Sequence, residues 1–569
     1  MNSKAQDNTI DSLSQIPAVF IEYLKTKGIV GKEATHKFLH PSLADLPTPK
    51  LLKNLPEAAR LAVEYIIAKK QIIIWGDYDV DGTTGTALLV NFFRELGTHV
   101  EWYIPNRLKE GYGINVKWFN PKNRKLADDF LLITVDCGIS DHRQIEAIKN
   151  IGGKVIITDH HSLPEQSIPD CLVLNPSQPS CGFHGEHLAG VGVAFYLAAG
   201  IRAELSSNVL LASVAGRLNL KKYLAFVALG TIADIVHLAT TNRILVRAGF
   251  EALAEPHFVG LKELLTSCEI SGDQITSEDI GYLLGPRINA AGRLGESRIV
   301  VELLTEEDPK KAKRLAQKLT ELNMERRRIS EENLETALTS LSISLVARDK
   351  CVIARGELHR GVAGIVASRL VDKFKVPAIV FAKNQHPDGQ IYYTGSARSV
   401  EGVNIVGLFA KCTEWIEKYG GHEMAAGLTV RENNIKNFEA YFISLAREAM
   451  EILQIKPKKQ YDIRCPAELA MDKDHLNCFR LLEPFGPGNP QPVFRDPAVT
   501  IVDSRTVGRE SEHLQVTVRG KFTNFKGIGF NLGKHLNDIQ RTPNRNMIYT
   551  PTMNRFRGAI NWQIRVIDL

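Results

Sequence analysis

The segment IIIWGDYDVDG, residues 72–82, places three carboxylates directly after a short apolar run. Asp77, Asp79 and Asp81 are spaced two residues apart, and Gly82 follows them. Carboxylates held this close together raise one another's pKa unless a positive charge lies among them. The segment therefore predicts a site for cations at the end of a strand.

The spacing of these aspartates matches the first half of a calcium-binding EF-hand loop, but the rest of the segment does not. Such a loop needs a bidentate glutamate at its twelfth position, where this chain has Leu88. A helix also leads into an EF-hand loop, whereas a strand-like run precedes Asp77. We therefore exclude a calcium loop of this type.

A second interpretation is a phosphatase of the haloacid-dehalogenase type, in which a D-x-D-G-T segment supplies a nucleophilic aspartate and an acid. Asp79 to Thr83 fit that pattern, and the strand before them is in the right place. An enzyme of this type uses one magnesium ion and a lysine, and its mechanism gives little role to adjacent histidines such as His160 and His161. This interpretation stays open as the alternative.

A third interpretation is a site for two divalent cations. Further candidate ligands follow other predicted strands or helices of the same region: Asp136 in VDCG, His160 and His161 in TDHH, and Asp234 in TIAD. Carboxylates with imidazoles and without thiolates suit Mn²⁺ or Mg²⁺ better than Zn²⁺. Such metal pairs bind both the attacking and the leaving oxygen of a phosphoryl displacement. The residues therefore predict metal-dependent hydrolysis of a phosphoester.

The elements that must position these residues alternate between short apolar runs and helix-like segments. From residue 71 onward, IIIW, HVEWYIP, LLITVDCG, KVIITDHH and CLVLNP are typical of strands. Such alternation indicates βαβ units with a parallel sheet. Because ligands of these sheets bind beyond the carboxyl ends of the strands, the candidate residues should meet at one edge.

At 569 residues the chain is too long for one core. We expect an α/β fold in five segments: an N-terminal helical segment at 1–68, a catalytic domain with a parallel sheet at 69–300, a long connecting helix at 301–348, a second α/β domain at 349–450, and a C-terminal β-barrel at 461–569. The lysine-rich stretch at 455–460 is expected to be a linker.

The composition is that of a soluble globular protein, with 44% hydrophobic and 24% charged residues. The N-terminal residues lack the apolar region of a secretory signal, and no apolar run is long enough to span a membrane. The eight cysteines lack zinc or redox spacing. We therefore expect a cytoplasmic protein with reduced thiols and no membrane contact.

The net charge of +6 is concentrated near the C-terminus. Residues 513–567 contain nine lysines and arginines against one acid, Asp538. Aromatic residues are interleaved with them: Phe522, Phe525, Phe530, Tyr549, Phe556 and Trp562. Cations can follow phosphates while rings stack on bases, so the segment suits a single-stranded nucleic acid. The alternative is a solvated basic face whose aromatic rings belong to the core.

These segments together resemble the DHH phosphoesterase family and, within it, the exonucleases specific for single strands. The resemblance spans roughly residues 45–569 and rests on motifs in one order: GDYDVDG (76–82), VDCGIS (135–140), TDHH (158–161), GTIADIV (230–236), GPRINAAGRL (285–294), GSARS (395–399) and GGHEMAAGL (420–428). It implies a DHH domain, a connecting helix, a DHHA1 domain facing the first across a cleft, and an OB-fold.

The resemblance also implies an activity. The expected enzyme is a monomeric 5′→3′ exonuclease that acts on single-stranded DNA in recombination and repair and releases 5′-mononucleotides. It would use two Mn²⁺ or Mg²⁺ ions. A single-strand-binding protein and a helicase are the expected protein partners. A small-substrate phosphatase or oligonucleotide hydrolase, and a DNA-binding scaffold without metals, remain competing hypotheses, against which the basic barrel and the retained carboxylates respectively argue.

By position in the family motifs, the candidate ligands divide between two metals. Asp79 and Asp136 would hold one ion. Asp81, His160 and Asp234 would hold the other, with Asp136 bridging the two.

The chain departs from the pattern of relatives such as the manganese pyrophosphatases, in which a histidine four residues before Asp79 binds the first metal. Trp75 occupies that position here. Asp77 is the natural substitute; alternatively, the first metal is held more weakly and arrives with the substrate. His161 would face the scissile phosphate.

Seven residues are candidates for nucleic-acid binding: Arg107, Tyr112, Arg287, Arg293, Ser396, Arg398 and His422. Arginine offers bidentate contacts to phosphate, and neighbouring glycines let backbone N–H groups approach closely. The resemblance implies that one arginine of GPRINAAGR, with Ser396 and Arg398, binds the 5′ end. A salt bridge between domains is the alternative role for each arginine.

Overall fold

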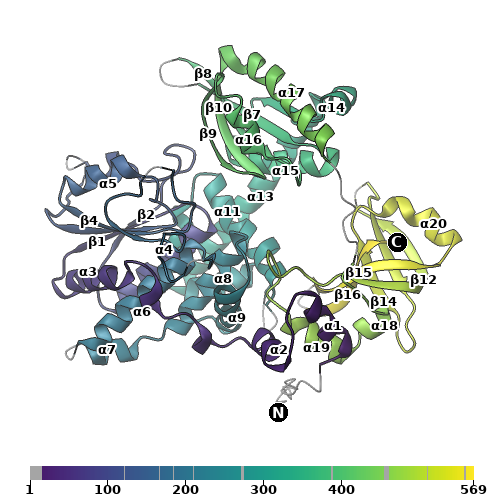
Figure 1. The fold of residues 1–569 in the computed structure, drawn as a ribbon, viewed down its shortest axis with the longest axis horizontal. Coiled ribbons are helices and arrows are strands. Elements are labelled where there is room, and N and C mark those ends of the chain that lie inside the picture. The colour runs from purple at the N-terminus through teal and green to yellow at the C-terminus, as the bar shows by residue number, and fades with distance from the viewer. Residues whose placement is uncertain are drawn as a thin grey trace.

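The computed structural model describes residues 16–569, apart from 121, 123, 166, 184, 209–210, 271–274, 386–388, 454–460, 509 and 557–558, and the side chains of 556 and 559. The predicted linker at 455–460 and residues 1–15 of the predicted N-terminal segment therefore lie outside the described residues. Three sheets define three bodies (Figure 1). The predicted α/β fold with a C-terminal barrel is confirmed.

The first sheet is entirely parallel, in the order β2-β1-β3-β4-β5. Its strands are β1 Gln71–Gly76, β2 Glu101–Tyr103, β3 Phe130–Val135, β4 Gly153–Thr158 and β5 Leu172–Leu174. The central strands are buried on both faces, as a parallel sheet covered by helices requires. Because the strand order reverses between β1 and β3, a crevice is expected at their carboxyl ends.

Helices α4 Val80–Glu95, α6 Gly190–Ser207 and α8 Leu224–Ala233 pack against one another beside this sheet. Their side chains are buried almost all round, because each helix lies inside the core rather than on its surface. The largest hydrophobic cluster of the molecule joins them to β1 and β3. The elements that carry the aspartates are therefore rigidly held.

The predicted connecting helix is present. Helix α13, Pro309–Thr339, runs for 31 residues and is followed by α14, Ile343–Asp349. It begins where Asp308 accepts a hydrogen bond from the Lys310 N–H at 2.8 Å and Pro309 occupies the first helical position.

The second sheet has the order β6-β7-β8-β10-β9, with only β6 and β7 parallel. Its strands are β6 Val352–Gly356, β7 Ala378–Gln385, β8 Ile391–Arg398, β9 Ile416–His422 and β10 Ala425–Arg431. Helix α15, Ala363–Phe374, covers one face and α17, Ile435–Ile452, the other. In this register Arg398 and His422 both lie opposite Ala425, at one end of the sheet.

The third sheet closes into a barrel because β12 pairs with both β13 and β15. Its strands are β11 Ile463–Arg464, β12 Phe494–Val507, β13 His513–Val518, β14 Phe525–Gly529, β15 Asn544–Phe556 and β16 Ala559–Asp568. Helices α1 Ala18–Thr26 and α2 Lys32–Leu39 share the hydrophobic core of this region (Figure 1). The N-terminal helices thus belong with the far end of the chain, whereas α3, Leu55–Ile67, packs on the first domain.

The remaining helices are α5 His142–Lys149, α7 Ala212–Arg217, α9 Thr240–Ala254, α10 Val259–Ser267, α11 Gly285–Arg293, α12 Arg298–Leu304, α16 Ile405–Ala410, α18 Ala467–Ala470, α19 Lys473–Leu481 and α20 Leu536–Arg541. A π-helical turn, η6 Asp279–Leu284, runs directly into α11. None of the helices in the described ranges is both long and apolar enough to cross a membrane.

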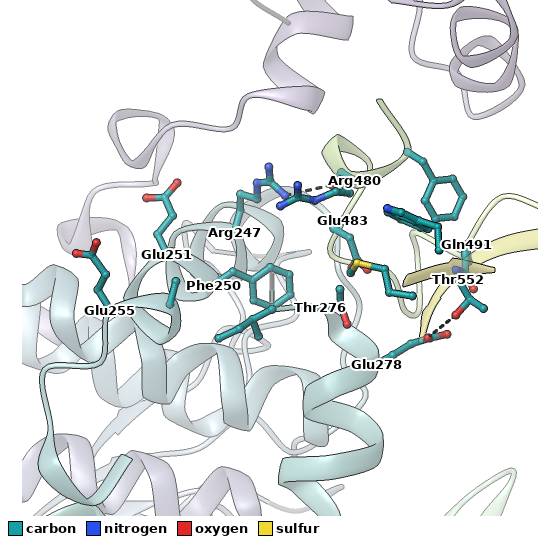
Figure 2. Close-up of a pocket in the computed structure, with 15 residues that line it drawn as sticks. Arg247, Phe250, Glu251, Glu255, Thr276, Glu278, Arg480, Glu483, Gln491 and Thr552 are labelled. Atoms are coloured by element: carbon teal, nitrogen blue, oxygen red, sulfur yellow. Dashed lines mark hydrogen bonds between the residues drawn. The ribbon is translucent and has the colours of Figure 1, made fainter. Parts of the chain in front are cut away.

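Partly buried ion pairs hold the barrel against the first domain. The Arg555 guanidinium donates to both carboxylate oxygens of Asp279, at 2.8 and 2.9 Å. Arg565 donates to Glu278 at 2.9 Å, and the Thr552 hydroxyl donates to the same carboxylate at 3.0 Å. A cavity of about 410 Å³ lies between α9 and the barrel next to this contact (Figure 2).

Candidate active site

The turn from β1 into α4 presents Asp77, Asp79 and Asp81 at the carboxyl edge of the first sheet. Asp79 is the N-cap of α4, and its Oδ1 accepts a hydrogen bond from the Gly82 N–H at 3.0 Å. A Cβ on Gly82 would lie 2.6 Å from the Asp77 carbonyl oxygen, so only glycine allows the helix to start this close to the strand.

The N-terminus of helix α6 fixes the orientation of the Asp81 carboxylate. The two carboxylate oxygens of Asp81 accept hydrogen bonds from the backbone N–H groups of Gly190, at 2.6 Å, and Val191, at 2.8 Å. These donors form the first turn of α6, where the helix dipole also favours a negative charge. Asp81 is therefore fixed in position although it lies in the core.

Asp136 follows β3 in a left-handed backbone conformation, with φ of 61°. Residues other than glycine adopt this conformation at a cost, and such strain is typical of functional sites. The Asp136 N–H donates to the Thr158 carbonyl at 2.8 Å, and the Tyr112 hydroxyl donates to the Asp136 carbonyl at 3.1 Å. The predicted binding residue Tyr112 thus lies beside the predicted ligand Asp136.

His160 lies at the centre of the acidic residues. Its Nε2 is 3.2 Å from Asp136 Oδ1, 3.4 Å from Asp234 Oδ2 and 3.8 Å from Asp81 Oδ2. Three sets of candidate ligand atoms, each within 4.8 Å of one another, connect the predicted residues: Asp81, His160 and Asp234; Asp136, His160 and His161; and Asp77, Asp79 and Asp136. The structure therefore brings all seven predicted metal-binding or catalytic residues together.

Three atoms of this group are buried without a hydrogen-bond partner among the described residues. They are Asp77 Oδ1, Asp136 Oδ1 and His160 Nε2. Buried polar atoms are normally paired, so unpaired ones that face a common point indicate a bound ion. Oxygen ligands with imidazole fit Mn²⁺ and Mg²⁺, and the residues present are thus suited to both metals.

The electrostatics of the carboxylates support this interpretation. Burial and the charge of Asp79 raise the pKa of Asp81 to about 7. Burial and the charge of Asp81 raise the pKa of Asp234 to about 8 and hold that of Asp136 well above its ordinary value. Without cations these acids would take up protons at neutral pH.

The two adjacent histidines have opposite electrostatic roles. Burial, with the charge of His161, lowers the pKa of His160 to about 4, so its ring is neutral, as a metal ligand must be. Burial also opposes charge on His161, but a 2.8 Å hydrogen bond to Asp159 raises its pKa to about 9. His161 is therefore a cation at neutral pH and lies beside the carboxylates.

Asp159 is a functional residue that the sequence analysis did not assign. Its carboxylate accepts hydrogen bonds from the N–H groups of Ile139, His160 and His161 and bonds the His161 ring. It therefore orients both histidines, a role that outer-shell carboxylates commonly have at metal sites. The motif TDHH placed it there, but the sequence alone does not show where its side chain points.

Trp75 takes no part in the site. Its indole is fully buried, stacks against Phe119 and Tyr103, and donates to the Gly113 carbonyl at 3.3 Å. It belongs to the hydrophobic cluster that contains Ile73 on the same strand, whereas Ile72 and Ile74 belong to the main core. Asp77, two residues later, lies among the candidate ligands instead.

Arginines from both α/β domains converge near the acidic centre. Burial, together with the charges of Arg107 and Arg398, lowers the pKa of Arg293 to about 10. Burial and Arg107 likewise lower the pKa of Arg398. Within the described residues none of the three has an ion-pair partner, so they form a site for an anion. Ser396 lies beside Arg398, since a Cβ on Gly364 would be 2.9 Å from both side chains.

Arg287 does not join this cluster. Its Nη1 donates to the Leu283 carbonyl at 2.9 Å, and its charge acts on the Cys268 thiol. Arg287 and Arg293 are six residues apart on α11, which places them on different faces of the helix. Of the two arginines in GPRINAAGR, the structure brings only Arg293 to the site. His422 lies at the end of β9, close enough to help lower the pKa of His160.

The aromatic residues of the barrel divide between surface and core. Phe522 and Phe530 are 86% and 57% exposed. Tyr549 is buried, and Phe525 and Trp562 pack against the same core; the side chain of Phe556 lies outside the described residues. Two of the basic residues, Arg555 and Arg565, are used in the ion pairs to the first domain. The core interpretation therefore holds for Tyr549, Phe525 and Trp562, and contact of Phe522 and Phe530 with a nucleic acid stays a prediction.

Three family models match the chain. Residues 71–231 match the N-terminal domain of the DHH family, residues 348–448 the DHHA1 domain, and residues 461–568 the RecJ OB domain.

Among curated proteins, the chain is similar to the single-stranded-DNA-specific exonuclease RecJ of several bacteria. It is 34% identical to that of Bacillus subtilis, over 96% of this chain and 67% of the relative, and 34% identical to that of Haemophilus influenzae, over 93% of each. The Escherichia coli protein is 32% identical over 99% of this chain and 97% of the relative.

Solved structures agree with these sequence matches. RecJ of Thermus thermophilus in complex with Mn²⁺ is 28% identical, with a TM-score of 0.76 over 97% of this chain and 78% of that chain. An exonuclease RecJ bound to manganese is 32% identical, with a TM-score of 0.60 over 72% of this chain and 98% of that chain.

Proposed function

The chain belongs to the RecJ family of DHH phosphoesterases, and from this membership we propose that it is a 5′→3′ exonuclease specific for single-stranded DNA. It releases 5′-mononucleotides by hydrolysis of the terminal phosphodiester and acts in recombination and repair. The observation that carries the proposal is the linkage of three sets of ligand atoms through Asp136 and His160. A single centre of this kind serves two cations.

Each candidate ligand has a role in this proposal. Asp77, Asp79 and Asp136 would hold one cation, and Asp81, His160 and Asp234 would hold the other, with Asp136 within reach of both groups. When bound, two divalent cations supply Lewis-acid stabilisation of the phosphate charge and a lowered pKa for water. The carboxylates neutralise the cations, and the hydrogen bonds from α6 keep Asp81 in place.

His161 contributes a positive charge that does not come from a metal. The Asp159 carboxylate raises the pKa of His161 and so favours the protonated ring, and Nδ1 lies 2.8 Å from Asp159 Oδ1 and 3.4 Å from the Tyr112 hydroxyl, which restricts the orientation of the ring. A protonated imidazole beside the scissile phosphate stabilises negative charge that develops on the phosphate oxygens.

The arginine cluster explains why the enzyme would act at an end. Arg107, Arg293 and Arg398, with Ser396, hold the 5′-terminal phosphate, while the next phosphodiester lies among the carboxylates. Unpaired guanidinium groups that are largely buried bind phosphate strongly because water competes poorly with them. A 5′ phosphate held there would place the terminal phosphodiester, rather than an internal one, at the carboxylates.

The decisive experiment digests 5′- and 3′-labelled DNA, single- and double-stranded, in Mn²⁺, in Mg²⁺ or in chelator. We expect the 5′ label to appear first in mononucleotides, only from single strands, and only with metal. Release of the 3′ label first, or equal digestion of duplex, would refute the polarity or the strand specificity.

The dehalogenase-type alternative is set aside. It needs Asp79 as a phosphorylated nucleophile and leaves the histidines dispensable, whereas His160 lies within 3.8 Å of three carboxylates. A protein with Asp79 intact that forms no phosphoenzyme intermediate, together with loss of activity in His160→Ala, would agree with this.

The remaining parts of the proposal concern partners and location. The enzyme acts as a monomer in the cytoplasm, together with a single-strand-binding protein and a helicase. The RecJ family membership supports these expectations. Analytical ultracentrifugation tests the monomeric state, and affinity capture from the source cells followed by mass spectrometry tests both protein partners.

A further inference from the structure

The π-helical turn η6 exposes an aromatic ring close to the active site. Tyr282 is 71% exposed and, in the described part of the chain, has no hydrogen bond or ring partner. A Cβ on the neighbouring Gly281 would meet nothing within 4 Å, so the surface of η6 at Gly281 is also open. π-Helical turns are rare and commonly occur at functional sites.

Tyr282 lines a groove of about 740 Å³ whose wall includes Ala233 and Ile235, the two neighbours of the candidate ligand Asp234 in the chain. Ile235, which directly follows the candidate ligand Asp234, lies in the wall of the groove and is 70% exposed. Arg293 of the anion site also lines it, and Arg565 of the barrel contributes to the same groove. The groove therefore runs from Arg293 of the anion site to the barrel.

The walls of the groove suit unpaired bases. Its apolar lining comes from the segment after α8, from α15 and from the loop before the barrel, and includes Ile235, Ile365 and Phe485. Positive charge comes from Arg293 and Arg326, which have no ion pair among the described residues, whereas Arg565 is paired with Glu278, which also lines the groove. Apolar surface and an aromatic ring accept base faces, while arginines accept phosphates, which is the pattern of single-strand sites. In a duplex the base faces are already stacked and paired, so they cannot use this surface.

We propose that Tyr282 stacks on a base of the strand downstream of the scissile phosphate and thereby determines the preference for unpaired DNA. The inference rests on the proposed function, because it takes the strand that enters the active site as the occupant of the groove. It assigns a specificity-determining role to a residue outside the metal and phosphate sites.

Steady-state cleavage of a single strand tests the proposal. We expect Tyr282→Ala to raise KM about tenfold with little change in kcat, since one base–aromatic stack is lost. Tyr282→Phe keeps the ring and should stay close to wild type. Tyr441→Ala is the control, since Tyr441 is an exposed tyrosine of α17 that does not line the groove. An unchanged KM in Tyr282→Ala, or an equal loss in Tyr282→Phe, would overturn the inference.

A substrate series locates the stacked base. Strands with a single abasic site at successive positions from the 5′ end should raise the KM of the wild type at one position. In Tyr282→Ala an abasic site at that position should not raise KM any further. If the abasic site raises KM by the same factor in both proteins, Tyr282 does not contact that base.

A binding measurement separates this inference from the proposed function. Strands with 2-aminopurine at the same position should lose fluorescence on binding to Asp136→Ala protein, and keep it on binding to the Asp136→Ala/Tyr282→Ala protein. Quenching that persists in the double variant overturns the inference. If the wild type degrades no strand, the proposed function fails, and the quenching result still decides the role of Tyr282.

Discussion

At the scale of single residues, the active site depends on groups whose environment opposes their own charge. Asp81, Asp136 and His160 are buried next to other acids or histidines, and their pKa values are shifted toward the neutral forms. Two cations reverse this situation, because they make the ionised carboxylates favourable. Metal binding and the structure of the site are therefore linked.

The substitution Asp136→Ala should disrupt metal binding at the site. Because Asp136 belongs to two of the three ligand sets, we expect cleavage to fall by more than about a hundredfold and Mn²⁺ affinity to fall with it. Single-strand binding should remain, since the arginine cluster is intact. Isothermal titration with Mn²⁺ and a nuclease assay measure the two effects, and a variant that cleaves normally would contradict the assignment.

Arg293 and Arg287 provide a matched pair. Loss of a charge-assisted contact costs about 1.5–3 kcal/mol, so Arg293→Ala should raise the KM for a 5′-phosphorylated strand by roughly ten- to a hundredfold. Arg287→Ala should leave KM nearly unchanged, because Arg287 bonds its own helix. Kinetics with strands that carry or lack the 5′ phosphate test this, and similar KM values for the two variants would contradict the placement of the anion site.

At the scale of elements, close contacts between strand ends and helix starts set the position of each ligand. The first turn of α6 binds Asp81 and also touches Asp136, since a Cβ on Gly190 would lie 2.6 Å from Asp136 Cβ. The start of α6 thus positions two candidate ligands, Asp81 and Asp136.

Gly190→Ala should therefore damage the metal site. The added methyl must displace Asp136 or the start of α6, so we expect weaker Mn²⁺ binding and at least about tenfold lower activity. Gly192→Ala is the control two residues along the helix, where the nearest side-chain atom to a Cβ is Leu188 Cβ at 3.5 Å. Equal loss in both variants would indicate a general effect on α6 rather than on the ligands.

At the scale of the whole molecule, the barrel is docked to the first domain through buried charged groups. Glu483 is fully buried at this contact and accepts hydrogen bonds from the Ser277 hydroxyl and the Phe485 N–H, both at 2.8 Å. Burial raises its pKa from 4.5 to about 7. The contact therefore favours the protonated carboxyl.

This shift predicts that stability falls as pH rises. The unfolded carboxyl ionises above its ordinary pKa while the folded one stays protonated, so stability declines between pH 4.5 and about 7. The loss amounts to about 3 kcal/mol, at 1.36 kcal/mol for each pKa unit. Thermal unfolding from pH 5 to 8 should show a smaller decline for Glu483→Gln, and parallel curves would contradict the assignment.

The sequence allowed much of the fold to be predicted, for local reasons. Hydrophobic runs such as LLITV, with acids directly after them, specify parallel strands and place their carboxyl ends at one edge. The long helix α13 followed equally from the high helix propensity of its residues. The packing of α1 and α2 on the barrel could not be predicted, because that contact joins residues more than 400 positions apart.

By itself, the sequence determined which groups could bind cations and that they gather where the first sheet ends, because residue type and strand periodicity are local properties. Only the tertiary structure decided how each group is used. It directs Trp75 into the hydrophobic core and Asp77 toward the ligands, selects Arg293 over Arg287, and makes Asp159 the group that orients both histidines. These outcomes depend on which helix face or strand end meets a distant segment, and that follows from packing rather than from spacing along the chain.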